Sequence, residues 1–169
     1  MVPSIMNRTR LLPLLLLLAL TALSACAHRS VVHLDRQPWQ MNSRQTLKMA
    51  FLRFDYQTVE IDGKYGIKGK AVPVMDRVPE WARWIDEMRL TAYLSDEYGE
   101  VLMESEQPFL PGPFQPNAVF HFDFLMDESA VKKGPVFVSF GYRVLLSESR
   151  DKPKNAKHPF FASEGAVTR

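Results

Sequence analysis

Apolar and polar side chains alternate along two stretches in the second half of the chain. In residues 118–126 three phenylalanines and a methionine recur at every second position, and residues 136–146 repeat the pattern with valines and aromatic residues. Successive side chains of a β-strand point to opposite faces of the sheet, so this period predicts strands with one buried face. The residues predicted to face inward are Phe120, Phe122, Phe124, Met126, Val136, Val138, Phe140, Tyr142, Val144 and Leu146.

Further strands, separated by turns, predict an all-β domain. Residues 46–61 are rich in aromatic and β-branched residues, and a turn at Asp62-Gly63-Lys64 follows them. Residues 87–94 alternate again, and residues 95–99 fit a hairpin loop that ends on its glycine. Six or seven short strands joined in this way are typical of a single antiparallel β-sandwich. We expect this domain to occupy residues 45–147.

The N-terminus has the pattern of a secretory signal. Two arginines precede an almost wholly apolar stretch, residues 11–23, and small residues lead to Cys26. The sequence Leu23-Ser24-Ala25-Cys26 resembles the lipobox of bacterial lipoproteins. The resemblance implies removal of residues 1–25, lipidation of Cys26, and a mature protein that acyl chains hold to a membrane of the cell envelope.

Two other interpretations of this segment remain open, an ordinary cleaved signal and an uncleaved anchor. A membrane-spanning helix needs about 20 apolar residues, whereas roughly 13 are present and Pro13 interrupts them. Met1 and Met6 are both candidate start residues, because Met6 leads directly into the basic flank. In lipoproteins an Asp after the cysteine favours the inner membrane. Ala27 stands there, so the resemblance implies the outer membrane, with the protein facing the periplasm.

The mature chain is expected to be formally neutral. The full chain has 21 Lys and Arg and 19 Asp and Glu, and its first 25 residues hold Arg8 and Arg10 but no acidic residue, so 19 of each sign remain. Nucleic-acid-binding domains carry a broad basic surface, and we therefore expect no nucleic-acid partner. Cys26 is the only cysteine, so the fold must rest on a hydrophobic core and not on disulfides within the chain.

The segments on either side of the predicted sandwich lack strand periodicity. We expect residues 26–44 to form a lipidated tether, in which Trp39 and Met41 could dock onto the domain. We expect residues 148–169 to form a disordered basic tail. A segment of this composition buries too little apolar surface to offset the entropy lost on ordering.

A second resemblance covers residues 68–124. It is carried by Gly69-Lys70-Ala71, by the sequence MRLTAYLSDEYGEVL and by the sequence FLPGPFQPNAVFHFDF. These stretches resemble the FxLYD-type immunoglobulin-like domains of bacterial envelope proteins. The chain departs from that pattern in the residues of its hairpin and in a longer spacing after Ala71. The resemblance implies an immunoglobulin-like sandwich without a catalytic site.

Four aromatic side chains are candidates for binding a partner protein. Three prolines stiffen residues 109–116, so displaying Phe109 and Phe114 there would cost little entropy on binding. Trp81 and Trp84 lie three residues apart and would share one face of a helical turn. The alternative for all four is burial, with the phenylalanines in a rigid crossover and the tryptophans plugging the end of the sandwich.

The sequence indicates no catalytic group, metal site or cofactor. The four histidines are scattered, whereas a zinc site needs three or four converging ligands. His121 and Asp123 share one face of a strand, which alternation alone explains. The carboxylates of residues 96–106 fit a solvated hairpin better than a calcium loop, because their spacing does not match an EF-hand.

These observations favour two hypotheses about function over a third, an enzyme, which would need a cleft in which polar groups converge. The first is a non-enzymatic envelope lipoprotein that acts as a binding or assembly component, with another envelope protein as its partner. The alternative is a carrier or receptor for a small apolar or lipidic ligand, which the density of phenylalanine suggests. That alternative needs an interior cavity, whereas protein cores are normally filled by such side chains.

Overall fold

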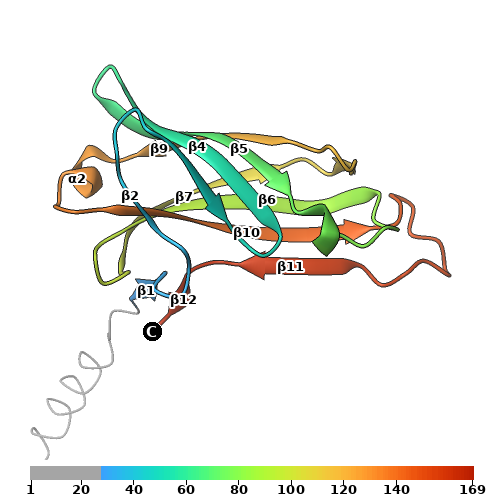
Figure 1. Ribbon diagram of the computed structural model, residues 1–169. Helices are drawn as coiled ribbons and strands as arrows, with labels where there is room; N and C mark the ends of the chain where they lie inside the picture. Colours follow the sequence, from blue (N-terminus) through green and yellow to red (C-terminus); the bar gives the residue numbers. More distant parts are fainter. Residues whose placement is uncertain (1–27) are drawn as a thin grey trace, which may run out of the picture.

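Two antiparallel sheets pack face to face in the computed structural model, which describes residues 28–169 (Figure 1). The four-stranded sheet consists, in spatial order, of β3 (Arg44–Lys48), β4 (Leu52–Ile61), β5 (Lys64–Pro73) and β9 (Phe120–Met126). The main path of the six-stranded sheet consists of β11 (Phe160–Glu164), β10 (Phe137–Ser147), β6 (Trp84–Ser95) and β7 (Val101–Phe109).

Short elements complete the chain. In the six-stranded sheet, β2 (Gln37–Pro38) pairs with β10, and β8 (Gly112–Pro113) pairs with β6. A separate two-stranded sheet joins β1 (Arg29–Ser30) to β12 (Val167–Thr168). The helical elements of the described chain are a 3-10 turn, η1 (Met75–Arg77), and a one-turn helix, α2 (Glu128–Val131).

The order of the main strands is that of an immunoglobulin-type sandwich. In such folds strands A, B and E share one sheet and strands G, F and C the other, with C′ beside C in variable-type domains. Here β4, β5 and β9 take the places of A, B and E, while β11, β10, β6 and β7 take those of G, F, C and C′. The predicted all-β antiparallel sandwich is confirmed, with eight strands of five residues or more instead of six or seven.

Aromatic side chains fill the space between the two sheets. The alternation predicted for β9 and β10 is confirmed, since the inward residues of both strands belong to the buried core. Phe54 of β4 stacks on Phe140 of β10 with ring centroids 4.3 Å apart, and Phe122 of β9 lies 5.5 Å from Phe140. Among the phenylalanines of β9 and β10, Phe122 packs against Phe124 and Phe140, and Phe120 packs against Phe109. Phe137 is half-buried under the guanidinium of Arg36.

The stretch predicted as one strand over residues 46–61 forms two. The chain turns between β3 and β4, where the Met49 amide donates to the Leu52 carbonyl at 2.9 Å. Phe51 and Leu52 are adjacent in sequence and both are buried. These consecutive apolar residues lie at a turn that directs both side chains into the core. This turn contains no glycine or proline, so its sequence carries no turn signal.

The described part of the predicted tether, residues 28–44, packs onto the sandwich, so that prediction is wrong. β1 and β2 are both paired, and Val31 is fully buried. Trp39 contacts Tyr65 edge-on, with ring centroids 6.3 Å apart. Pairing with strands distant in sequence orders this segment, and local periodicity does not reveal such pairing. Residues 1–27, which include the predicted signal and Cys26, lie outside the described residues.

The predicted disordered tail is also wrong for its last part. β11 pairs with β10 over five residues, and its inward-facing Phe160 lies 5.6 Å from Phe51 between ring centroids. Glu164 accepts hydrogen bonds from the Tyr142 hydroxyl at 2.5 Å and from the Ala50 amide at 2.9 Å. The segment is polar overall, but it is ordered because β11 pairs with β10 at the edge of the sheet and Phe160 packs against the core.

Both ends of the described chain lie on the outer face of the six-stranded sheet (Figure 1). The Arg29 guanidinium lies over the outward-facing Tyr93 ring of β6, 5.8 Å from its centroid. The Ala166 amide donates to the Tyr93 hydroxyl at 3.3 Å. The terminal segments thus cover this face, whereas the outer face of the four-stranded sheet remains exposed along β3, β5 and β9.

Candidate functional site

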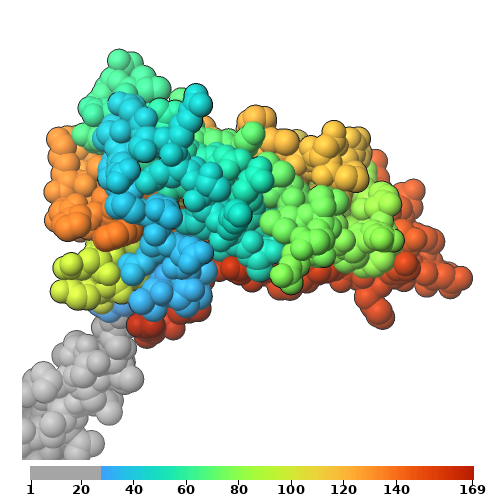
Figure 2. Space-filling model, viewed as in Figure 1, coloured from blue at the N-terminus to red at the C-terminus, as the bar shows by residue number. Residues whose placement is uncertain are grey.

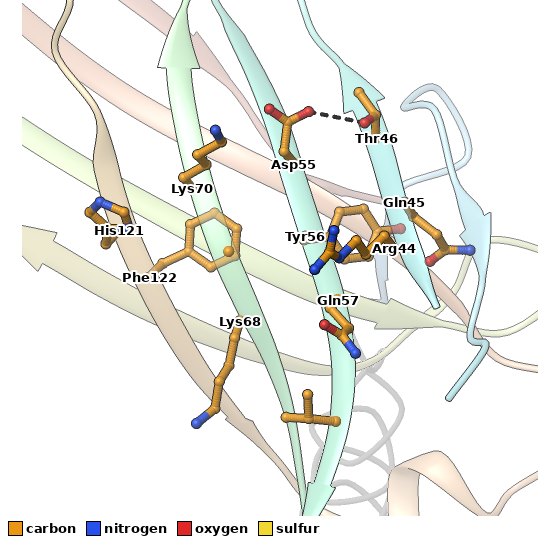
Figure 3. Close-up of a pocket in the computed structure, with 12 residues that line it drawn as sticks. Arg44, Gln45, Thr46, Asp55, Tyr56, Gln57, Lys68, Lys70, His121 and Phe122 are labelled. Carbon is orange, nitrogen blue, oxygen red and sulfur yellow. Dashed lines mark hydrogen bonds between the residues drawn. The ribbon is translucent and has the colours of Figure 1, made fainter. Parts of the chain in front are cut away.

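The uncovered outer face of the four-stranded sheet contains a shallow hollow with a volume of about 770 Å³. Figure 3 shows Lys68 and Lys70 of β5 there, with His121 of β9 on one side and Asp55 of β4 on the other. Alternation along three neighbouring strands brings these side chains to one face. The lining residues are Arg44, Gln45, Thr46, Asp55, Tyr56, Gln57, Val59, Lys68, Gly69, Lys70, His121 and Phe122.

Positive charge exceeds negative charge in this hollow. Lys68 pairs with Asp123 at 3.2 Å, and Asp55 is paired with a neighbouring arginine at the same distance. Arg44 and Lys70 have no ion-pair partner within residues 28–169. On the outer face of the six-stranded sheet, by contrast, the arginines are paired: Arg29 with Glu104, Arg89 with Glu87 and Glu106, and Arg143 with Glu87.

An exposed apolar strip adjoins the basic hollow. Gly66 of β5 stands in register between Val59 of β4 and Leu125 of β9. Leu125 is 64 % exposed and Ile61 is 52 % exposed. A Cβ at Gly66 would lie 3.1 Å from the Phe124 carbonyl oxygen and 3.5 Å from Val59, so a larger residue at this position would crowd its neighbours.

The basic hollow and the apolar strip form one continuous surface. A second hollow surrounds Gly66 and shares Val59 and Lys68 with the first. Figure 2 shows the molecule from the side, with the β4–β5 hairpin projecting at the upper left and the C-terminal segment along the lower edge. We call this surface the open face and define it by Arg44, Asp55, Gln57, Val59, Ile61, Gly66, Lys68, Lys70, His121, Asp123 and Leu125.

The two phenylalanines proposed as partner contacts do not project from a loop. Phe114 is 4 % exposed and belongs to the hydrophobic core, so its predicted display is wrong. Its amide donates to the Arg83 carbonyl at 2.8 Å, which ties the loop to the start of β6. Phe109 ends β7 and is half-buried against Phe120, edge-on with ring centroids 5.4 Å apart. Leu110, the next residue, is the exposed one, at 89 %.

The two tryptophans lie at the same end of the sandwich as Phe114, but not on one helical turn. Trp84 begins β6, where it pairs with Pro113 and Ser147. Trp81 precedes that strand, packs half-buried against the core, and has the Lys157 ammonium 6.0 Å from its ring centroid. A hollow of about 280 Å³, lined in part by Phe114, Val78 and Pro116, lies at this end. This geometry is closer to plugging of the core than to display.

The polar groups considered for catalysis or metal binding have structural partners or face solvent. His121 and Asp123 are both exposed on β9, and Asp123 is paired with Lys68. The Asp96 carboxylate accepts from the Tyr98 and Glu100 amides at 3.0 and 2.8 Å, as expected for a residue that shapes a hairpin. In the part of the chain that the structure describes, no three His, Cys, Asp or Glu side chains are grouped so as to hold a metal ion.

Two buried tyrosines have raised pKa values for different reasons. Burial raises the pKa of the Tyr56 hydroxyl well above its ordinary value, because the charged form would be poorly solvated. Burial also raises the pKa of Tyr142, and the Glu164 carboxylate that accepts its hydrogen bond raises it further. The Tyr56 hydroxyl has no hydrogen-bond partner among residues 28–169. Neither hydroxyl is poised to transfer a proton near neutral pH.

The open face was not predicted from the sequence, although part of its signal is present there. The predicted inward positions of β9 imply that His121, Asp123 and Leu125 face outward together. Grouping these residues with Lys70 and Arg44 requires knowing which strands lie beside β9. The sequence of one strand does not reveal its neighbours in the sheet.

Neither the anchor nor a family assignment receives support from the described residues. Cys26 lies outside them, and within them no helix has the length and apolarity needed to cross a membrane. Comparison with family models, with curated proteins and with solved structures finds no match to this chain. The lipobox and the FxLYD-type resemblance therefore stay predictions.

Proposed function

We propose that this protein is a non-enzymatic lipoprotein of the cell envelope that binds another envelope protein. The observation that carries the proposal is the placement of the open face and of the chain ends on opposite sides of the sandwich. A lipid near the start of the chain would leave the open face free for a partner. The lipobox-like sequence Leu23-Ser24-Ala25-Cys26 supplies the anchor in this proposal.

The proposed anchor would hold the domain close to the membrane. Arg29, the first residue of β1, follows Cys26 by three residues, and three residues span at most about 11 Å. Because residues 28–44 are packed, no long spacer separates lipid from domain. Several acyl chains, at about 0.8 kcal/mol for each buried methylene, would hold such a protein stably, whereas one chain binds only marginally. Ala27 favours the outer membrane, facing the periplasm.

The partner is testable in cells with a photo-crosslinking residue placed on either sheet. We expect Leu125, on the open face, to give a reproducible crosslink to one envelope protein when it is replaced by the photo-reactive residue. The matched control is Phe161, which is 51 % exposed on the outer face of the six-stranded sheet. No crosslink at Leu125 from cells rich in the protein, or equal crosslinks at both positions, would contradict a binding role for the open face.

A further inference from the structure

We propose that the open face docks an extended, acidic polypeptide segment of the partner that carries apolar residues beside its carboxylates. The inference deepens the proposed function and rests on it only for the location of the partner. Its support is the charge, shape and position of one exposed sheet face.

Charge complementarity indicates an acidic occupant. Arg44 on β3 and Lys70 on β5 line the basic hollow without an ion-pair partner in the described chain. His121 lies beside Lys70, in register with it on the neighbouring strand. The acidic groups of this face, Asp55 and Asp123, are already engaged by cations. A carboxylate-bearing ligand would therefore meet free cations here.

The apolar strip beside the basic hollow indicates that the occupant also carries apolar side chains. Leu125 and Ile61 are more than half exposed, and Gly66, which has no side chain, stands in register between Leu125 and Val59. Burying such side chains on a partner is favourable at about 25 cal/mol for each Å² removed from water. An apolar group on the partner would contact the apolar strip while its carboxylates reach Lys70 and Arg44.

The length of the open face indicates a polypeptide and not a single anionic group. The part of β4 that belongs to the open face runs from Asp55 to Ile61, a distance of about 20 Å for six residues of strand. One phosphate or carboxylate would occupy only a small part of this length, whereas an extended peptide of similar length would cover all of it. An anionic lipid is the less suitable occupant, because the open face lies opposite the chain ends and would point away from an anchoring membrane.

The test measures binding of fluorescent peptides to the full chain purified in detergent. The probe peptide has two leucines followed by alternating glutamate and threonine, and a second peptide has lysine in place of glutamate. We expect the acidic peptide alone to bind, with an affinity that falls as salt screens the charges. The double variant Arg44→Glu with Lys70→Glu should weaken binding by at least about tenfold, because it places like charges against the peptide.

Matched variants separate the site from general electrostatics. Arg150→Glu with Lys154→Glu changes the net charge equally on an exposed loop, and it should leave binding within about twofold of wild type. Leu125→Asn should weaken binding about fivefold, and should have no effect on a peptide in which the leucines are replaced by threonine. Circular dichroism of each variant checks that the sandwich is folded.

Three results would overturn the proposal. The first is no binding of the acidic peptide to the folded protein, and the second is an equal loss of binding in the two double variants. The third is binding of phosphatidylglycerol vesicles or inorganic phosphate that depends on Arg44 and Lys70 and excludes the peptide. The assay uses detergent-solubilised protein, so its outcome does not depend on lipidation. Failure of the peptide assay with an intact lipid anchor would reject the docking inference alone, whereas an unlipidated chain that binds the peptide would reject the anchor alone.

Discussion

Tyr56 and Tyr142 are both buried, but only the Tyr142 hydroxyl has a hydrogen-bond partner in residues 28–169. A buried polar group without a partner loses its bonds to water and gains none. Tyr56→Phe should therefore raise the free energy of unfolding by about 1 kcal/mol, and Tyr142→Phe should lower it by about 1 kcal/mol. Denaturant unfolding of the two variants measures both values. A loss of stability in Tyr56→Phe would show that its hydroxyl has a partner, such as a buried water.

The same two tyrosines predict how stability changes at alkaline pH. Their pKa values are raised in the folded protein, whereas the unfolded tyrosines titrate near the ordinary value of about 10. Below about pH 10 both tyrosines are protonated in the folded and the unfolded protein, and their contribution to stability is fully present. Above it the unfolded chain releases protons that the folded chain retains, so stability falls as the pH rises.

Urea unfolding between pH 8 and pH 11 measures this alkaline loss, and both tyrosine-to-phenylalanine variants should show a shallower decline than wild type. An unchanged slope in the two variants would mean that other groups cause the decline. At this scale the sequence predicted burial of Tyr142, because the period of β10 places it with the core residues. It did not predict the partner Glu164, because that residue lies in the segment expected to be disordered.

At the scale of the element, the side chain of Gln107 joins the edges of the two sheets. Its amide group donates to the His121 carbonyl and accepts from the Asp123 amide, both at 3.2 Å. A side chain of β7 thus takes the place of a neighbouring strand along the edge of β9. Exposed strand edges are sites of aggregation, so the contact protects β9 as well as linking the sheets.

Gln107→Leu should lower the free energy of unfolding by about 1–2 kcal/mol, since two backbone groups lose a partner. It should also promote aggregation, which light scattering during thermal unfolding would detect. Gln115→Leu, on an exposed loop, is the control and should change neither quantity. Equal behaviour of the two variants would mean that water replaces the Gln107 amide at no cost.

Substitutions in β11 test whether the C-terminal segment is ordered. Phe160 packs against Phe51, and its neighbour Phe161 is half exposed under the Arg143 guanidinium. Phe160→Ala should lower stability by about 2 kcal/mol, roughly half the loss typical of a fully buried phenylalanine. Phe161→Ala should lower it by less than about 1 kcal/mol. Thermal unfolding of both variants measures the two losses of stability. No loss in either variant would mean that the C-terminal segment is disordered after all.

Long strands could be predicted from the sequence, whereas short pairings could not. β9 and β10 contain enough residues for their period to be evident, and their inward faces agree with the structure. β1, β2 and β12 have two residues each, which is too short to show any period. They are ordered by pairing with strands far away in sequence, and β11 is ordered in the same way.

In the molecule as a whole, the open face exists because the terminal segments cover only one of the two sheets. The terminal segments cover the outer face of the six-stranded sheet, where arginines are paired with glutamates. The outer face of the four-stranded sheet keeps its unpaired cations and its exposed leucine. Residues 28–169 are formally neutral, yet they have one basic face, which their net charge alone does not reveal.

Lipid on Cys26 is proposed to hold the domain to a membrane, and intact mass combined with membrane fractionation is the decisive test of this anchor. We expect wild type to be cut before Cys26, to carry acyl chains and to sediment with membranes. Cys26→Ser should lack this added mass and leave the membrane fraction. Wild type recovered as a soluble chain with an unmodified Cys26 thiol would rule out the lipid anchor.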